Sequence, residues 1–138
     1  MEPRVTLVTL SVPDVARSVD FYRSAFGWEP AFQVETTAFY DLKGLVFGLW
    51  SGLSEELGRD TDPPPGSVTL AHNVRSVGEV DRLVAAAVAG GATIAAAPHP
   101  QPWGGYSAHI ADPDGHLWEI AFNPDWPLDA EGRVILPL

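Results

Sequence analysis

The chain has 138 residues, of which 46% are hydrophobic and 19% are charged. This length predicts one folded domain, and the composition is that of a globular protein rather than a disordered one. Eighteen acidic residues outnumber eight basic ones, which gives a formal net charge of −10. A chain of this charge repels the phosphate backbone of a nucleic acid, so nucleic-acid binding is not expected.

The sequence contains no cysteine, which excludes disulfides, thiolate metal sites and a cysteine nucleophile. No apolar run approaches the roughly 20 residues that a membrane helix needs. The first residues, Met1 to Arg4, lack the basic start and apolar stretch of a signal peptide. We therefore expect a cytoplasmic protein with no membrane partner.

The first half of the chain predicts a strand, a helix and three further strands. Residues 5–12 alternate between two faces, which is strand periodicity. Asp14 is placed to cap a helix, whose apolar side chains recur at helical spacing until Gly27. Three short strand candidates follow at 31–35, 37–42 and 45–50.

The same order recurs after residues 54–66, whose sequence SEELGRDTDPPPG has no apolar periodicity and indicates a linker. Ser76 and Glu79 have the spacing of a capping box at the start of a second helix, and Gly90 marks its end. The strand candidates of this half lie at 68–74, 92–96, 106–111 and 117–122.

Strand–helix–strand–strand–strand therefore occurs twice, with one helix for each sheet. A helix on only one face of each sheet places the chain in the α+β class. We predict two tandem βαβββ modules that form a curved mixed sheet around a ligand cavity, within one domain spanning residues 1–138. The modules lie at about 4–52 and 67–123, the linker at 53–66 and a C-terminal tail at 124–138.

Two local strings carry a family resemblance. The first is LSVPDVARS, which begins at Leu10, and the second is DPDGHLWEI, residues 112–120, in which Gly115 allows a positive φ at the turn. Both resemble the vicinal-oxygen-chelate superfamily, which contains glyoxalase I, extradiol dioxygenases and bleomycin-resistance proteins. The resemblance extends from about Val5 to Asn123 and implies a glyoxalase-like fold and a homodimer.

Metal-dependent members of that superfamily take their metal ligands from the first and last strands of each module. The resemblance places these four positions at Leu7, Gly48, Thr69 and Glu119, of which only Glu119 has a side chain that could bind a metal. Lyases and dioxygenases with a divalent metal need three or four protein ligands. No cofactor is therefore expected, and a divalent metal is disfavoured. The bleomycin-resistance branch sequesters a drug without metal ligands from the protein.

Glu119 and His109 are the candidate catalytic residues. Glu119 alternates with Trp118 and Ile120, which predicts that it points into the cavity, where it could act as a base or pair with a cationic ligand. His109, in the preceding strand, is expected on the same side and could complete an acid–base pair. The structural alternatives are a Glu that hydrogen-bonds to neighbouring strands and a cavity-wall His without chemistry.

Four further residues are ligand-binding candidates: Trp50, Trp103, Ser107 and Asn73. The two tryptophans could stack on a planar ligand, although packing against the neighbouring module explains them equally well. The parity of His72 matches that of Val74, so it is expected in the core beneath the helix. His99, in a proline-flanked loop, could reach the rim of the cavity, and His116 belongs to a turn; neither carries a specific signal.

We predict a metal-independent protein that binds a small molecule, in particular a planar or cationic compound. Three rivals stay open at this point. The first is a glyoxalase-type lyase or dioxygenase with atypical divalent-metal ligation. The second is a metal-free acid–base enzyme that uses Glu119 and His109. The third is a scaffold whose cavity is filled by its own side chains.

Overall fold

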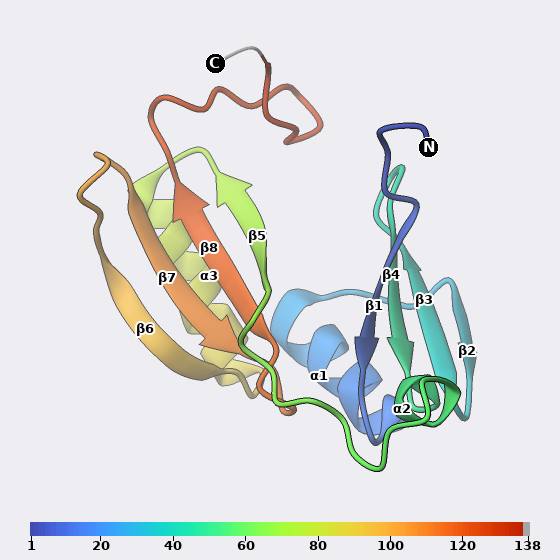
Figure 1. Ribbon diagram of the computed structural model, residues 1–138. Coiled ribbons are helices and arrows are strands. Elements are labelled where there is room, and N and C mark those ends of the chain that lie inside the picture. The colour runs from blue at the N-terminus through green and yellow to red at the C-terminus, as the bar shows by residue number, and fades with distance from the viewer. Residues whose placement is uncertain (137–138) are drawn as a thin grey trace. The chain divides into compact units, whose positions relative to one another are not determined.

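The computed structural model describes residues 1–136, and the chain divides into two compact units between Pro64 and Pro65. Each unit contains one four-stranded sheet (Figure 1). Among residues 1–136, no helix is long and apolar enough to cross a membrane. The predicted α+β class and the two βαβββ modules are confirmed.

The first unit contains β1 (Leu7–Ser11), α1 (Val15–Phe26), β2 (Phe32–Val34), β3 (Thr37–Asp41), β4 (Val46–Trp50) and α2 (Leu53–Glu56). Its sheet has the order β1-β4-β3-β2, in which β1 runs parallel to β4 and the other pairs are antiparallel. The parallel pair needs a crossover, which α1 begins, whereas tight turns suffice for the antiparallel pairs.

Helix α1 begins and ends where the sequence predicts. The carboxylate of Asp14 accepts a hydrogen bond from the Arg17 N–H at 2.9 Å, and Gly27 ends the helix in the left-handed region with φ 71°. The buried side of α1 is aromatic. The Tyr22 ring packs edge-on against Phe47, with 5.1 Å between the centroids, and also contacts Tyr40. Tyr40 and Phe47 therefore face α1.

The second unit repeats this plan with β5 (Thr69–Val74), α3 (Val77–Ala89), β6 (Thr93–Pro100), β7 (Tyr106–Ala111) and β8 (Leu117–Phe122). Its strand order, β5-β8-β7-β6, is that of the first sheet, and again only the first pair is parallel. In both units the last strand lies between the first and third strands of its module, so the internal repeat seen in the sequence is a repeat of topology.

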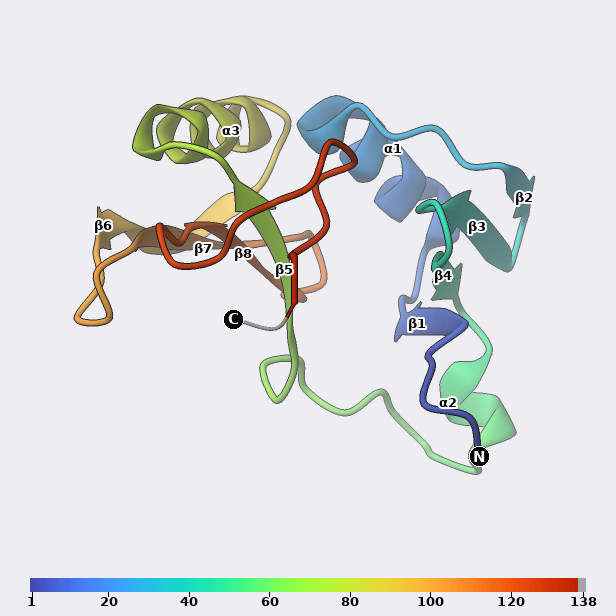
Figure 2. The same ribbon diagram turned by 90° about the horizontal axis from the view of Figure 1, so that it is seen from above.

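Helix α3 covers one face of the second sheet, as Figure 2 shows. The Ser76 hydroxyl accepts from the Glu79 N–H, and the Glu79 carboxylate accepts from the Arg75 N–H at 2.6 Å. The predicted cap thus forms, with the Glu79 side chain bonding one residue earlier than in a standard capping box. The Tyr106 hydroxyl of β7 donates to the Asp81 carboxylate of α3 at 2.8 Å. The even-numbered residues of β7 therefore face the helix.

The structure differs from the predicted linker and from the predicted second strand of the second module. Helix α2 lies at the start of the expected linker, and the Asp62 carboxylate accepts from the hydroxyls of both Ser11 and Ser54. Strand β6 continues past Ala96 to Pro100, with register shifts on either side of Ala96. Proline has no N–H to donate to a neighbouring strand. Prolines are tolerated in β6 because it is an edge strand, which has a neighbour on one side only.

The expected tail begins beyond β8 and folds back on itself. An isolated bridge pairs Leu128 with Val134, and the Asp129 carboxylate accepts from the Arg133 N–H at 2.9 Å and pairs with the Arg133 guanidinium. The Arg75 guanidinium, at the end of β5, donates to the Asp129 carbonyl. The tail is therefore anchored to the second unit. Residues 137 and 138 of the expected tail lie outside the described residues.

Candidate functional site

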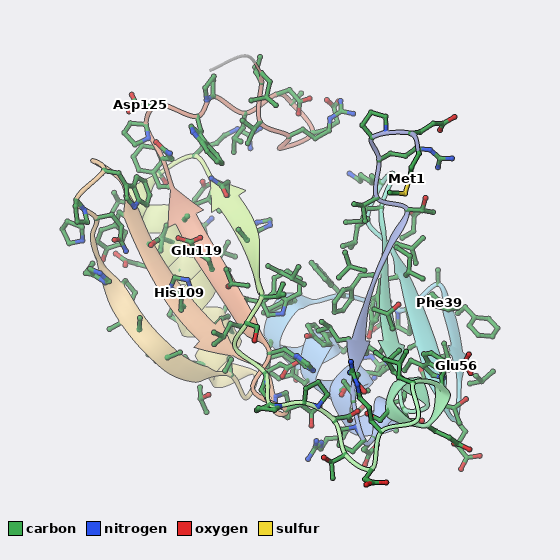
Figure 3. The ribbon with its side chains drawn as sticks, viewed as in Figure 1. Met1, Phe39, Glu56, His109, Glu119 and Asp125 are labelled. Carbon is green, nitrogen blue, oxygen red and sulfur yellow. The ribbon has the colours of Figure 1, made fainter. Side chains whose placement is uncertain are left out.

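The candidate site is the face of the second sheet that α3 does not cover, called here the open face. Because side chains alternate along a strand and Tyr106 faces α3, Ser107 and His109 lie on the open face. In the antiparallel register of β7 and β8, His109 lies directly opposite Glu119. Directly opposed residues share one face, so Glu119 also lies on the open face, as Figure 3 shows.

Glu119 and His109 are therefore cross-strand neighbours, with about 5 Å expected between their Cβ atoms. Both side chains are half-buried. Neither side chain forms a hydrogen bond or an ion pair with another of residues 1–136. Their polar atoms are not among the fully buried atoms that lack a partner in this part of the chain. The register thus holds the carboxylate and the imidazole close together, and no other described side chain engages either of them.

A second group of polar side chains, Ser107, Gln101 and His99, begins two residues before His109 on β7. Ser107 is fully buried and accepts a hydrogen bond from Gln101 Nε2 at 2.8 Å. Gln101 Nε2 also lies 3.3 Å from His99 Nε2, and His99 Nδ1 lies 2.7 Å from the Ala97 carbonyl. The candidate residue Ser107 is therefore covered, and Gln101 lies over it. His99 belongs to β6, opposite Ser107, and not to the predicted loop.

Gln101 was missed by sequence reasoning. Two prolines bracket His99, and Pro102 follows Gln101, so this stretch has the composition of a loop. A signal was nevertheless present, because His99 and Gln101 keep the two-residue spacing of a strand. The extension of β6 brings both side chains toward Ser107.

Trp103 lies in the turn between β6 and β7 and is 46% exposed. Its ring lies over Gly105, where a Cβ would approach Trp103 Cζ3 to 1.7 Å and the Phe122 carbonyl oxygen to 2.5 Å. Gly105 has the parity of Ser107, so its missing side chain would point to the open face. Trp103 therefore borders the open face beyond Ser107, and glycine is required there for its ring to fit.

The candidates on β5 border the same face. Ala71 is opposite Glu119, and half-buried Asn73 is opposite Ala121. Thr69 lies opposite Leu117, and its hydroxyl donates to the Leu117 carbonyl at 3.4 Å. Asn73 thus adds an amide at this edge, whereas the hydroxyl of Thr69 is directed at the backbone of β8.

The equivalent face of the first sheet has no ionisable side chain at the two positions that match Glu119 and His109. Gly48 takes the register position of Glu119, and Phe39 takes that of His109. A Cβ at Gly48 would meet Thr9 Oγ1 at 3.1 Å, Leu7 Cδ1 at 3.2 Å and Phe39 Cε1 at 3.3 Å. The Phe39 ring also stacks on Phe32, with 5.9 Å between centroids. The two modules therefore present different chemistry at equivalent positions.

Trp50 lies on this face of the first unit. It borders a hollow of about 480 Å³ that is open to solvent and is also lined by Thr36, Gly52, Glu55 and Glu56. A Cβ at Gly52 would lie 2.7 Å from the Trp50 Nε1 atom, so the indole packs on that glycine. The expectation that Trp50 shares one space with Glu119, His109 and Trp103 stays a prediction.

The metal that the family resemblance implies does not fit the residues present. At the four expected positions, Leu7 and Gly48 offer no ligand atom, Thr69 is bonded to the backbone, and Glu119 has only His109 beside it. Among residues 1–136, no three His, Cys, Asp or Glu side chains are grouped so that they could hold an ion. Two protein ligands are fewer than a divalent-metal enzyme uses.

His72 was expected to be a core histidine, and this was wrong. It has the predicted parity, opposite Ile120, but β5 is an edge strand and the residue is exposed. Although the residue as a whole is exposed, desolvation of its ring lowers the pKa of His72 below its usual value, while the Glu79 carboxylate on α3 acts in the opposite direction. His116 lies in the predicted turn, where its backbone N–H donates to the Asp112 carboxylate at 2.9 Å.

Two βαβββ modules, each with one helix and one helix-free sheet face, define a tandem-module α+β protein. The sequence model of the family described as the Glyoxalase/Bleomycin resistance protein/Dioxygenase superfamily matches residues 4–120. The chain belongs to this superfamily.

Solved structures agree with this assignment. A glyoxalase-related enzyme from Fulvimarina pelagi is 40% identical, with 99% of each chain covered and a TM-score of 0.90. The chain is also similar to a family enzyme from Burkholderia phytofirmans PsJN, at 22% identity over 85% of this chain and 96% of that chain, with a TM-score of 0.74. Lactoylglutathione lyase from Agrobacterium tumefaciens is 22% identical over 88% of this chain and 94% of that chain, with a TM-score of 0.68. These last two show the fold alone.

Proposed function

We propose that the protein binds a small organic molecule on the open face of the second sheet, through Glu119 and His109 and without a metal. The observation that carries this proposal is the direct pairing of these two residues across β7 and β8, with no partner for either side chain among the described residues. A structural ion pair or a core hydrogen bond would have engaged them.

The ligand class is a planar cation. Glu119 supplies a carboxylate without a cationic partner, and the chain as a whole is acidic, with a net charge of −10. A charge-assisted hydrogen bond to a carboxylate is roughly twice as strong as a neutral one. Trp103 borders the same face and offers an exposed indole on which a planar ligand can stack.

The test is the affinity for benzamidinium, a planar aromatic cation, measured by calorimetric titration. Glu119→Gln keeps the shape of the side chain but removes its charge, so it should weaken binding by about 1–3 kcal/mol. The matched control is Glu2→Gln, which removes one charge from an exposed residue of the first unit and should leave the affinity unchanged. Equal affinities for the wild type and Glu119→Gln would refute the proposal.

The same pair fits a second function, proton transfer on an enolisable substrate. In that reaction the Glu119 carboxylate takes a proton from the carbon next to a carbonyl group. His109 gives a proton to the enolate oxygen as it forms, and takes it back when the carbonyl is restored. The cross-strand pairing favours this function, and the relative from Fulvimarina pelagi is described as a glyoxalase-related enzyme. Here Glu119→Gln would abolish turnover of the substrate while its binding changed little.

A further inference from the structure

We propose that Gln101 is a ligand-contacting residue of the open face, and that its side-chain carbonyl is held outward as a fixed hydrogen-bond acceptor by Ser107 and His99. The inference deepens the function proposed above and rests on it, because it names the chemical group that the face selects. That group is a cation that carries N–H donors, such as an amidinium, a guanidinium or a primary ammonium, rather than a quaternary ammonium.

One backbone carbonyl fixes the direction of every hydrogen bond in this cluster. The Ala97 carbonyl can only accept, so His99 Nδ1, at 2.7 Å, must carry a proton and donate it. In the neutral ring, His99 Nε2 is then an acceptor. The Gln101 group that lies 3.3 Å from it must therefore be the amide NH2 and not the carbonyl oxygen.

The second N–H of the same NH2 group donates to Ser107 Oγ at 2.8 Å. Both protons of the amide nitrogen are thus engaged, one by His99 and one by Ser107. Because Ser107 is fully buried, it fixes the amide from below rather than contacting a ligand itself. Ser107 and His99 are in this sense positioning residues.

The remaining polar atom of the side chain is Gln101 Oε1. It forms no hydrogen bond within residues 1–136, and Gln101 is half-buried. The only buried side-chain N or O atom without a partner in this part of the chain is the Tyr40 hydroxyl. Oε1 is therefore open to solvent. An acceptor whose orientation is fixed in advance binds a donor with less loss of conformational entropy than a freely rotating one.

The open face therefore offers two kinds of acceptor in successive rows. Gln101 lies over Ser107, and Glu119 is opposite His109, which is two residues further along β7. Two residues of a strand span roughly 6.6 Å, so a single small molecule can reach both rows. The carboxylate attracts any cation, whereas the amide carbonyl distinguishes a cation with N–H groups from one without.

The experiment compares two aromatic cations in the full-length protein, by calorimetric titration with benzamidinium and with phenyltrimethylammonium. Benzamidinium has N–H donors and phenyltrimethylammonium has none. Gln101→Met keeps the length of the side chain and removes the acceptor. It should weaken benzamidinium binding roughly tenfold, the effect of one lost hydrogen bond, and leave phenyltrimethylammonium binding unchanged. His99→Ala, which frees the amide, should cause a smaller loss in the same direction.

Gln101→Met also removes the donor to the buried Ser107, so the double variant Ser107→Ala/Gln101→Met separates loss of stability from loss of recognition. It should show the same tenfold loss for benzamidinium alone. Equal weakening of both cations by Gln101→Met, or no change in either, would overturn the assignment of Gln101. The proposed function is tested separately, because Glu119→Gln should weaken both cations alike. A wild-type protein that binds neither cation would overturn both proposals.

Discussion

Tyr40 is a core residue whose hydroxyl has no hydrogen-bond partner among residues 1–136. It is packed against Tyr22, Trp28 and Phe47, and burial raises its pKa to about 12. A buried polar group without a partner costs about 1–3 kcal/mol in desolvation. The ring of Tyr40 therefore stabilises the core, whereas its hydroxyl lowers the stability.

Tyr40→Phe should consequently leave the free energy of unfolding unchanged or raise it by up to about 2 kcal/mol, as measured by urea denaturation. Tyr106→Phe is the matched control, because its hydroxyl donates to the Asp81 carboxylate at 2.8 Å and its loss should lower the free energy of unfolding rather than raise it. A loss of more than 1 kcal/mol in Tyr40→Phe would show that its hydroxyl has a partner after all.

The residues of the site could be predicted only where strand alternation decides their orientation. Glu119, His109 and Ser107 lie on the predicted face because β7 and β8 are regular and pair without a bulge. The burial of Ser107 could not be predicted, because it depends on a contact with Gln101, six residues away. Alternation gives the side of a sheet on which a residue lies but not what covers it there.

At the scale of elements, the ends of the helices show how far local chemistry determines the fold. Gly27 follows α1 with φ 71°, and a Cβ there would meet nothing within 4 Å. Gly78 lies within α3 and also has open space around it. The two glycines thus differ in backbone conformation and not in room for a side chain.

Alanine at these two positions should therefore have opposite effects on thermal or urea unfolding. Gly27→Ala should destabilise the protein by about 1 kcal/mol, because an L-residue pays that much in the left-handed region. Gly78→Ala should stabilise it by roughly 0.5–1 kcal/mol, since alanine loses less entropy in a helix. Effects of the same sign would contradict the conformation assigned to Gly27.

The elements that sequence reasoning missed are those whose formation depends on tertiary contacts. Helix α2 has four residues and no side-chain cap, and the Asp62 carboxylate links it to β1 by accepting from Ser54 and Ser11. Helices this short are not stable by propensity alone, so no periodic signal exists for them. The extension of β6 contains two prolines and needs an edge position that only the assembled sheet provides.

At the scale of the whole molecule, one topology occurs twice with different surface chemistry. The register positions of Glu119 and His109 on the second sheet correspond to Gly48 and Phe39 on the first. The topology could be predicted because both modules share strand and helix periodicity and turn residues. The presence of a carboxylate and an imidazole at these positions in only one module also follows from the sequence, once the register of the strands is known.

The most direct test of the central claim is to map benzamidinium binding by two-dimensional NMR of the 15N-labelled wild-type protein. Amide shifts should change for residues of β7, β8 and the turn that carries Trp103, in particular Ser107, His109 and Glu119. Residues of α3 should change least. Changes confined to the hollow bordered by Trp50 and Glu56, or the absence of any change on β7 and β8, would contradict a ligand site on the open face of the second sheet.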